Sequence, residues 1–577
     1  MTAPRRRNPS RGTSSAASDL RVRNAEAVFA RIPAERLNAA LAATSPSSPY
    51  RHAQTRIGEE HAAITDVAQL FALPTSPWFW DLVKLLPGND LTQQRRGRPA
   101  HYPDWLLFLL CCASAITGVC SRAAAAALLE QPHLWTQFAA HVDRYVPDGM
   151  TRIADLTPRP DRPARLKARP AAPPRPTPAR AMPPRSAAIP LPAQPPMPAP
   201  AQHHLDYFVL HWRGLDKASQ PLPPGHPWYG LRQRIIAEFE TLAVGQAQQM
   251  GLLDPTLDFQ YQRPDRSQYV GFDGTVMPLS RRHKGDSAQE WKTGEGRMVL
   301  GSKYTIASTR FDGEAHSRIC LGFAQTGRSR ESVYADEEKA VLDMALRLRS
   351  LSGGGMKGIV VDSAVRGHAV IDLQRHWLTV VNYPHAQSNP DGGAGNRLNP
   401  TRQEKDHLRR ISIHTDENGT PCEHFIYAYG GELVQLVETD DGHSIVRLPV
   451  IKYEQRPNRD GTRREYKSVQ IDCDIAGSYT ERVALFHTDS TSNDPQYNWG
   501  EVVRVFAPTT AEFQYLYGAR NDTESRHADL KSRIKYLPPD IPGQDLRMLG
   551  AMVTANALAW QVHLQAREQP NVFDGTA

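Results

Sequence analysis

The chain has 577 residues, of which 40% are hydrophobic and 22% charged, with a formal net charge of +7. That length accommodates roughly two to four domains with a large hydrophobic core. The longest apolar run, from Trp105 to Ile116, is too short to cross a bilayer, and the basic first residues are not followed by the apolar stretch of a secretory signal. A membrane span is therefore not expected, and we predict a cytoplasmic protein.

The excess of positive charge lies mostly in one segment, and the cysteines indicate no metal or disulfide framework. Residues 151–200 contain nine Arg or Lys against two Asp, so this one segment carries an excess equal to the whole net charge. Such a segment is compatible with a polyanionic partner, but charge alone does not identify one without specific binding residues. The spacing of the cysteines includes no CxxC pair and predicts neither a zinc site nor a disulfide framework. They lie at Cys111, Cys112, Cys120, Cys320, Cys422 and Cys473.

The first 150 residues are expected to form a basic disordered tail, 1–20, and an all-α domain, 21–150. Helices are predicted at 21–43 and 76–86. Residues 95–135 read as one helix, a break at Gly118, a second helix that opens at Ser121, and a further helix after Pro132. Two helices across a short turn are compatible with a helix-turn-helix, and equally with simple helical packing. A DNA-binding role would involve the preceding Arg95, Arg96 and Arg98.

Residues 151–202 are rich in proline, alanine and arginine and are predicted to form an extended linker, because nothing in them can build a core. Their arginines could contact DNA phosphates or could simply be solvated.

An alternation of strands and helices begins after the linker and a helix at 229–251. A short strand is predicted to end at Asp273, with Gly274 as a turn residue, and a second buried strand ends at Asp362. The glycines at 353–355 read as a turn only. The other predicted elements are strands at 298–309, 317–324 and 378–382 and helices at 332–348 and 366–375. Together they give the order β-β-β-α-β-α-β.

The region of about 384–505 breaks this rhythm and reads as a β-rich insertion, with Asp441-Gly442 and Asp460-Gly461 as turn signals. Its predicted strands are 424–430, 432–438, 444–454, 464–472 and 481–487. A helix at 544–565 is predicted to pack against the core.

The stretch from Tyr517 to Lys531 is predicted to be one helix, preceded by a possible capping box at Thr509 and Glu512. Its signature residues fall within a stripe roughly 60° wide at about 100° per residue, beside an apolar stripe of Leu516, Leu530 and Ile534. The stripe consists of Tyr517, Arg520, Glu524 and Lys531. A surface helix with an Arg–Glu pair would explain two of these residues.

The spacing Tyr-x2-Arg-x3-Glu-x6-Lys resembles the Y-R-E-K signature of one group of DDE transposases of bacterial insertion sequences. The resemblance implies an α/β fold with an RNase H-like catalytic core at 203–577, interrupted by the β-rich insertion. It also implies a catalytic, metal-binding triad of Asp273, Asp362 and Glu524. Clustered carboxylates repel one another unless cations neutralise them, and carboxylate oxygens suit Mg²⁺ or Mn²⁺. A pair of such ions is expected.

Further expectations follow from the resemblance. Tyr517, Arg520 and Lys531 would contact double-stranded DNA at the transposon ends, and a homodimer would synapse two terminal inverted repeats. Because one phosphodiester replaces another during strand transfer, no nucleotide cofactor is needed. Such an enzyme would work at the bacterial nucleoid. Two alternatives stay open: a catalytically inactive, transposase-derived DNA-binding protein, and a metal-dependent nuclease of the same fold. A hairpin route of cleavage also stays open, with Trp499, Tyr427 and Tyr429 as candidates to hold a flipped base.

Overall fold

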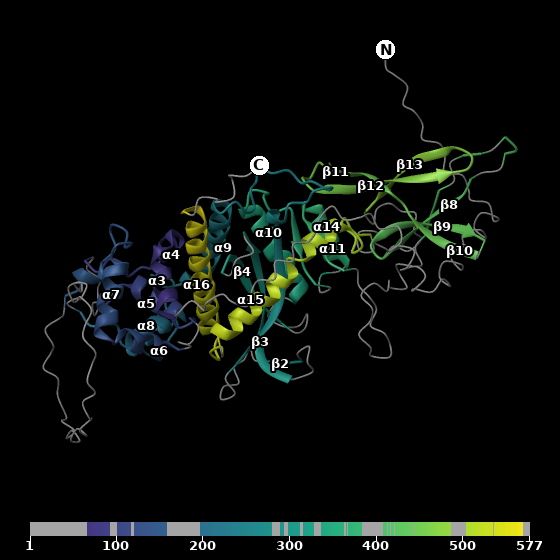
Figure 1. Ribbon diagram of the computed structural model, residues 1–577. Coiled ribbons are helices and arrows are strands. Elements are labelled where there is room, and N and C mark those ends of the chain that lie inside the picture. Colours follow the sequence, from purple (N-terminus) through teal and green to yellow (C-terminus); the bar gives the residue numbers. More distant parts are fainter. Residues whose placement is uncertain are drawn as a thin grey trace, which may run out of the picture.

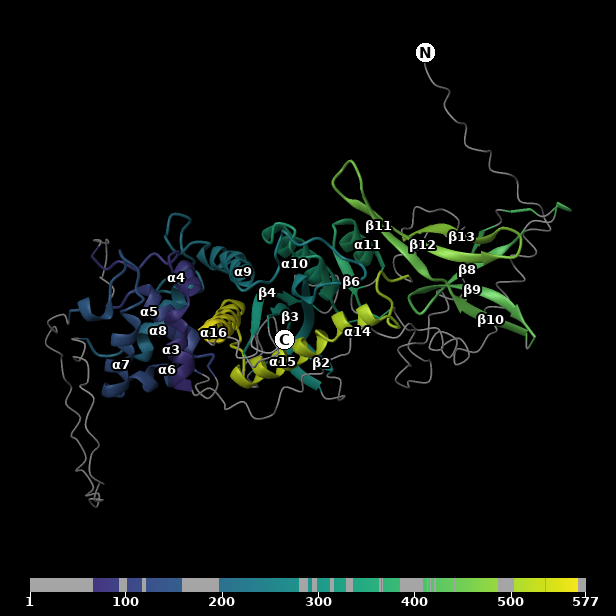
Figure 2. The ribbon, with the colours of Figure 1, turned by 45° about the horizontal axis from the view of Figure 1, so that its top comes forward.

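The protein is a mixed α/β structure with a helical N-terminal region, a central mixed sheet and two smaller β-sheets (Figure 1). It is seen in a computed structural model, in which these three parts follow one another along the long axis of the molecule (Figure 2). The structure describes residues 66–92, 101–116, 121–157, 197–279, 289–292, 298–311, 316–327, 336–362, 365, 367–383, 408–411, 414–415, 417–419, 422–440, 442–485, 503–534 and 536–568. The predicted tail at 1–20 and helix at 21–43 lie outside these residues.

The N-terminal region is helical, as predicted. Its helices are α3 (Asp66–Ala72), α4 (Pro77–Val83), α5 (Asp104–Ala113), α6 (Arg122–Leu129), α7 (Pro132–Val142) and α8 (Gln202–Trp212). All ten residues of α5 are buried, because α6, α8 and the C-terminal helix α16 (Ile541–Glu568) pack around it. The Ser121 side chain accepts a hydrogen bond from the Ala124 amide and caps α6. This confirms the helix start predicted at Ser121.

Both ends of the proline-rich stretch pack on the helical region. Thr151 donates its amide to the Asn89 carbonyl (2.9 Å), and the Trp135 indole donates to the Met197 carbonyl (2.9 Å). Helix α8, which follows the stretch, packs on α5 and α6. The chain therefore leaves and re-enters at one helical region. The first and last residues of the predicted linker, 151–157 and 197–202, thus belong to the helical region, and its other residues, 158–196, lie outside the described residues.

The central sheet has six strands in the order β2-β3-β1-β5-β6, with β4 paired to β3. Strands β1, β5 and β6 run parallel, whereas β3 is antiparallel to β1 and to β4. The strands are β1 (Tyr269–Pro278), β2 (Gln289–Lys292), β3 (Met298–Arg310), β4 (Arg318–Thr326), β5 (Gly358–Val360) and β6 (Thr379–Val381). The predicted β-β-β-α-β-α-β order is present, with the short β2 as an addition.

Helices cover this sheet (Figure 1). Strand β4 contacts α9 (Leu231–Gln249), α10 (Glu337–Leu351) and α16, while α11 (Gly367–Arg375) contacts β6. Helix α10 lies between β4 and β5 in the chain, and α11 between β5 and β6. Two turn glycines, Gly353 and Gly354, have φ of +60° and +83°, so the predicted turn before β5 is confirmed.

The prediction that a strand ends at Asp273 is wrong. Strand β1 continues through Asp273 to Pro278. Gly274 is not a turn residue: a Cβ there would lie 1.9 Å from the Glu337 carboxylate and 2.7 Å from the Lys303 side chain. Glycine is needed because an ion pair crosses the strand at this point.

The β-rich part contains two sheets, which pair as β10-β9-β8-β7 and β11-β12-β13. The predicted strand at 444–454 is two strands, because Pro449 has no N–H for a ladder and separates β10 from β11. Gly442 and Gly461 have positive φ and form turns as predicted. The strands are β7 (Leu408–Ile411), β8 (His424–Tyr429), β9 (Glu432–Thr439), β10 (Gly442–Arg447), β11 (Val450–Pro457), β12 (Arg463–Cys473) and β13 (Gly477–Ala484).

The predicted single helix from Tyr517 to Lys531 is two helices, α14 (Ala511–Tyr517) and α15 (Arg520–Arg533). A guanidinium explains the break: Arg266 Nη2 donates to the Tyr515 carbonyl (2.9 Å), so the Ala519 amide bonds to Leu516 instead (3.0 Å). The helix cap is also different from the prediction, since Thr510, not Thr509, accepts from the Phe513 amide.

Candidate functional site

Two of the predicted carboxylates lie close together, one within strand β1 and the other just beyond the neighbouring parallel strand β5. Gly271 of β1 is opposite Val360 of β5, so Asp273 and Asp362, each two residues further along, continue the same register. Residues two positions apart point to the same face of a sheet, and adjacent strands are about 4.8 Å apart. The strand predicted to end at Asp362 ends at Val360, so Asp362 lies two residues beyond β5, while Asp273 lies within the longer strand β1.

The Asp273 carboxyl is difficult to ionise in this position. Its side chain is 11% exposed. Burial and, next, the negative charge of Asp362 raise its pKa from 3.8 to about 6, against a lowering effect of Arg520 and of the Gly274 amide. The amide donates to Asp273 Oδ1 at 2.9 Å. A pair of carboxylates held this way favours a proton or a cation between them.

Helix α15 lies over β1 (Figure 1), and two of its basic side chains act on the aspartates. His527 Nδ1 is 3.5 Å from Asp273 Oδ2, and the charge of Arg520 acts on both Asp273 and Asp362. Arg520 Nη1 donates to the Tyr517 hydroxyl (3.3 Å), although Tyr517 belongs to α14. Leu530 and Ile534, on the apolar stripe, are fully buried as predicted.

A second ion pair next to Asp273 was not predicted. Lys303 of β3 contacts Glu337 at the start of α10, with Nζ 2.5 Å from Oε2, and the Glu337 charge also raises the pKa of Asp273. In the sequence, Glu337 looks like an ordinary acidic residue in the first turn of a helix. The clash that a Cβ at Gly274 would make with both side chains shows how close Lys303 and Glu337 lie to this strand.

The loop that follows β5 is held by buried polar side chains. Asn382, 1% exposed, donates to the main-chain carbonyls of Val365 (3.0 Å) and Asp362 (3.4 Å). Its own carbonyl oxygen accepts from Arg504 Nε (2.9 Å). Arg504 comes from the segment between β13 and α14, so the position of the Asp362 backbone depends on residues on both sides of the β-rich part.

The structure brings together Asp273, Asp362, Arg520 and Tyr517, and it places Lys531 elsewhere. Lys531 is exposed near the end of α15, about 16 Å along the helix axis from Arg520 at 1.5 Å per residue. Glu524 lies in α15 between Arg520 and His527, but its side chain is outside the described residues, as are Arg95, Arg96 and Arg98.

The residues considered for holding a flipped base are either buried or outside the described residues. Tyr427 and Tyr429 are fully buried in a small apolar cluster with Val434 and Ile445, so neither ring is accessible to a base in this conformation. Trp499 lies outside the described residues.

Comparison with known proteins assigns no family to the chain. No family model matches the chain, and no curated protein matches it either. Within the described part of the chain, none of the helices has both the length and the apolar content to cross a membrane.

Proposed function

We propose that the protein is a DDE-type DNA transposase of the Y-R-E-K group, which binds terminal inverted repeats and cuts and joins DNA with Asp273, Asp362 and Glu524. The observation that carries this proposal is the closeness of Asp273, in β1, to Asp362, two residues after the neighbouring parallel strand β5, beneath the helix that bears Arg520 and the position of Glu524.

The strand order supports an RNase H-like core. Its five main strands run β4-β3-β1-β5-β6 with β3 antiparallel to β1, and helices connect β4 to β5 and β5 to β6. The β-rich part falls between β6 and α14, that is, between the second aspartate and the glutamate. This is the position that the resemblance to Y-R-E-K transposases implies for an insertion.

The donor set fits a hard divalent cation such as Mg²⁺ or Mn²⁺. Burial, and next the charge of Asp362, raise the pKa of Asp273 to about 6, and the two carboxylates provide oxygen ligands that a cation would stabilise. Helix α15 would add Glu524, which lies between two residues that act on Asp273. When bound, a pair of such ions supplies activation of water and stabilisation of the leaving 3′ oxygen.

The protein's own basic groups would position DNA. Arg520 would contact a phosphate at the cleaved bond, with its guanidinium oriented by its hydrogen bond to the Tyr517 hydroxyl. Lys531, exposed at the other end of α15, would contact the backbone further along the duplex. A homodimer that synapses two ends at the bacterial nucleoid is part of the same proposal.

The test is incubation of the purified full chain with labelled DNA that carries the ends of its own element, with and without Mg²⁺. We expect 3′ hydroxyl ends and joined products from the wild type, and neither from Asp273→Asn or Glu524→Ala. Asp343→Asn, the same change at a half-exposed side chain of α10, is the matched control and should remain active. Cleavage without joining would instead indicate a nuclease, and DNA binding without cleavage an inactive descendant.

A further inference from the structure

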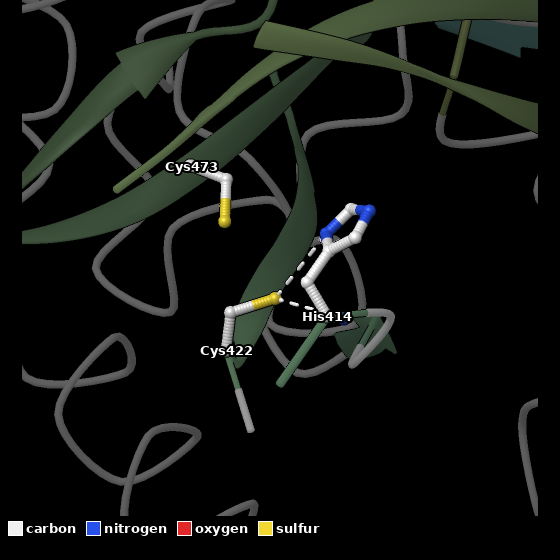
Figure 3. Close-up of side chains that lie close together, drawn as sticks. All are labelled: His414, Cys422 and Cys473. Atoms are coloured by element: carbon white, nitrogen blue, oxygen red, sulfur yellow. Dashed lines mark hydrogen bonds between the residues drawn. The ribbon is translucent and has the colours of Figure 1, made fainter. Parts of the chain in front are cut away.

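Three potential metal ligands meet in the β-rich part, and one of them comes from a strand far along the chain from the other two. The ligand atoms of His414, Cys422 and Cys473 all lie within 4.8 Å of one another (Figure 3). His414 and Cys422 precede β8, whereas Cys473 ends β12. The cluster therefore connects the sheet β10-β9-β8-β7 to the sheet β11-β12-β13.

The geometry matches part of a tetrahedral zinc site. With Zn–S near 2.3 Å and Zn–N near 2.0 Å, a tetrahedron has an S···N edge of about 3.5 Å and an S···S edge of about 3.8 Å. The observed distance from Cys422 Sγ to His414 Nδ1 is 3.6 Å, so this pair already has the required spacing. The remaining separations, at most 4.8 Å, need a shift of about 1 Å to meet the same values.

Backbone amides support both sulfurs, as expected around thiolate ligands. The His414 amide donates to Cys422 Sγ (3.3 Å), and the Ala476 amide donates to Cys473 Sγ (3.5 Å). The backbones of His414 and Cys422 are also joined, by the Cys422 amide and the His414 carbonyl (2.8 Å). Cys473 is buried and Cys422 is half-buried. Both sulfurs are therefore at least partly shielded from solvent.

A second imidazole lies beside the cluster. His424 is 8% exposed, and its ring and that of His414 both pack on Tyr479, with centroids 5.8 and 4.8 Å away. Its Nδ1 is 3.0 Å from the Gln435 amide nitrogen, and its Nε2 is buried with no hydrogen-bond partner among the described residues. A buried ring nitrogen without a partner is costly, and coordination to a metal would satisfy it.

We propose that His414, Cys422 and Cys473 bind one structural zinc ion that joins the two sheets of the β-rich part, with His424 as the fourth ligand. Thiolate and imidazole select zinc over Mg²⁺. This site is therefore chemically distinct from the carboxylate pair of the proposed active site, and the inference does not depend on the proposed function.

The test measures metal in the purified full chain by mass spectrometry after dialysis against Mg²⁺ without zinc. We expect about one zinc per chain in the wild type and its loss in Cys422→Ser and Cys473→Ser. His443→Ala, at a partly exposed histidine of β10 outside the cluster, should keep the zinc, as should Asp273→Asn.

Because a cysteine variant could fail to fold, the wild type is also loaded with Co²⁺ after removal of zinc. Thiolate-to-cobalt charge transfer and the ligand-field bands of a tetrahedral ion are the expected spectrum. Three results would overturn the proposal: wild-type protein that neither contains zinc nor takes it up from a buffer of defined free Zn²⁺, zinc that persists in both cysteine variants, or a Cys422–Cys473 disulfide in unreduced peptides.

Discussion

At the scale of single residues, the candidate site is defined by a charge that the fold makes unfavourable. Asp273 has its pKa raised to about 6 because it is buried and faces Asp362. A folded state that raises a carboxyl pKa binds the proton more tightly than the unfolded state does. The associated stabilisation is therefore present below the ordinary pKa of 3.8 and is lost as the pH rises through about 6.

Replacement of Asp273 by Asn should stabilise the protein when no divalent cation is present. At pH 8 we expect the free energy of unfolding to rise by about 1 to 3 kcal/mol, because the amide carries no charge to bury. At pH 5 the wild-type carboxyl is largely protonated, and the gain should shrink. Denaturant titration at both pH values measures it, with Asp343→Asn as control. Equal stabilities of wild type and variant at pH 8 would contradict the assigned repulsion.

The same variant should lose the response to Mg²⁺. Wild-type protein is expected to unfold at a higher temperature in Mg²⁺ than in chelator, since a ligand that binds only the folded state stabilises it. Asp273→Asn should show little difference between the two conditions. A Mg²⁺ shift that is unchanged in the variant would remove Asp273 from the metal site without any assay of DNA cleavage.

Sequence reasoning selected Arg520 by its place in the Tyr-Arg-Glu-Lys spacing, and Asp273 and Asp362 because each was expected to end an apolar strand. It could not identify Glu337, Lys303 or Asn382. Each of these acts through a contact with a residue far away in the chain, and its own neighbours in the sequence carry no trace of that contact. The proposed zinc ligands were not predicted for the same reason: strands β8 to β11 lie between Cys422 and Cys473 in the chain, so no short motif joins them.

At the scale of elements, caps and periodic apolar stripes predicted most helices, whereas breaks inside them depended on tertiary partners. Ser121 caps α6 from within its own turn. The break between α14 and α15, by contrast, depends on Arg266, whose guanidinium occupies the Tyr515 carbonyl and packs on the Tyr515 ring at 5.3 Å. No local feature of the sequence around Gly518 predicts the contact with Arg266.

Gly518→Ala tests this break. A Cβ would lie 2.6 Å from Arg266 Nη2, so Arg266 should leave the Tyr515 carbonyl, which the Ala519 amide could then reach in a continuous helix. Because alanine also favours helix, we expect stability to stay within about 1 kcal/mol. DNA cleavage should nevertheless fall at least about tenfold, because Tyr517 and Arg520 would turn relative to the aspartates. Gly225→Ala, in open space, is the control; normal cleavage by Gly518→Ala would show that the break is dispensable.

Another tertiary contact completes the edge of the central sheet. Asn556 of α16 donates from Nδ2 to the Cys320 carbonyl (2.9 Å) and accepts at Oδ1 from the Cys320 amide (2.8 Å). The ladder between β3 and β4 shifts register next to this residue. The amide side chain thus replaces a missing strand partner.

Asn556→Ala should destabilise the protein by about 2 to 4 kcal/mol, since two buried hydrogen bonds are lost and a backbone N–H is left unsatisfied. Gln565→Ala, on the exposed end of the same helix, should change stability by less than about 0.5 kcal/mol. Chemical denaturation of both variants gives the comparison. Similar losses in the two would mean that Asn556 acts only through helix propensity.

At the scale of the whole molecule, α16 joins the helical region to the central sheet (Figure 2). It contacts α3, α5 and α8 on the helical side and β4 and α9 on the sheet side. Polar contacts reinforce this junction: the Trp212 indole donates to the Pro542 carbonyl (2.8 Å), and Arg533 Nη1 donates to Gln69 Oε1 (2.7 Å). The helical region therefore shares its core with the C-terminal part of the chain.

This arrangement predicts that the proline-rich stretch is not what holds the helical region in place. A protease site introduced between residues 170 and 171 and then cut should give two fragments that stay associated in gel filtration. The apolar helix α5 of the first fragment is buried against α8 and α16 of the second, and two such faces separate only at a large hydrophobic cost.

Denaturant should be required to separate the fragments, and the cut protein should keep the far-UV spectrum of the intact chain. The control is the uncut protein carrying the same inserted site. If the fragments instead elute apart in buffer, the contacts of α5 with α16 are too weak to join the two parts, and the helical region must be regarded as tethered by residues 158–196. Association would mean that any DNA bound by the helical region is held at a fixed position relative to Asp273 and Asp362.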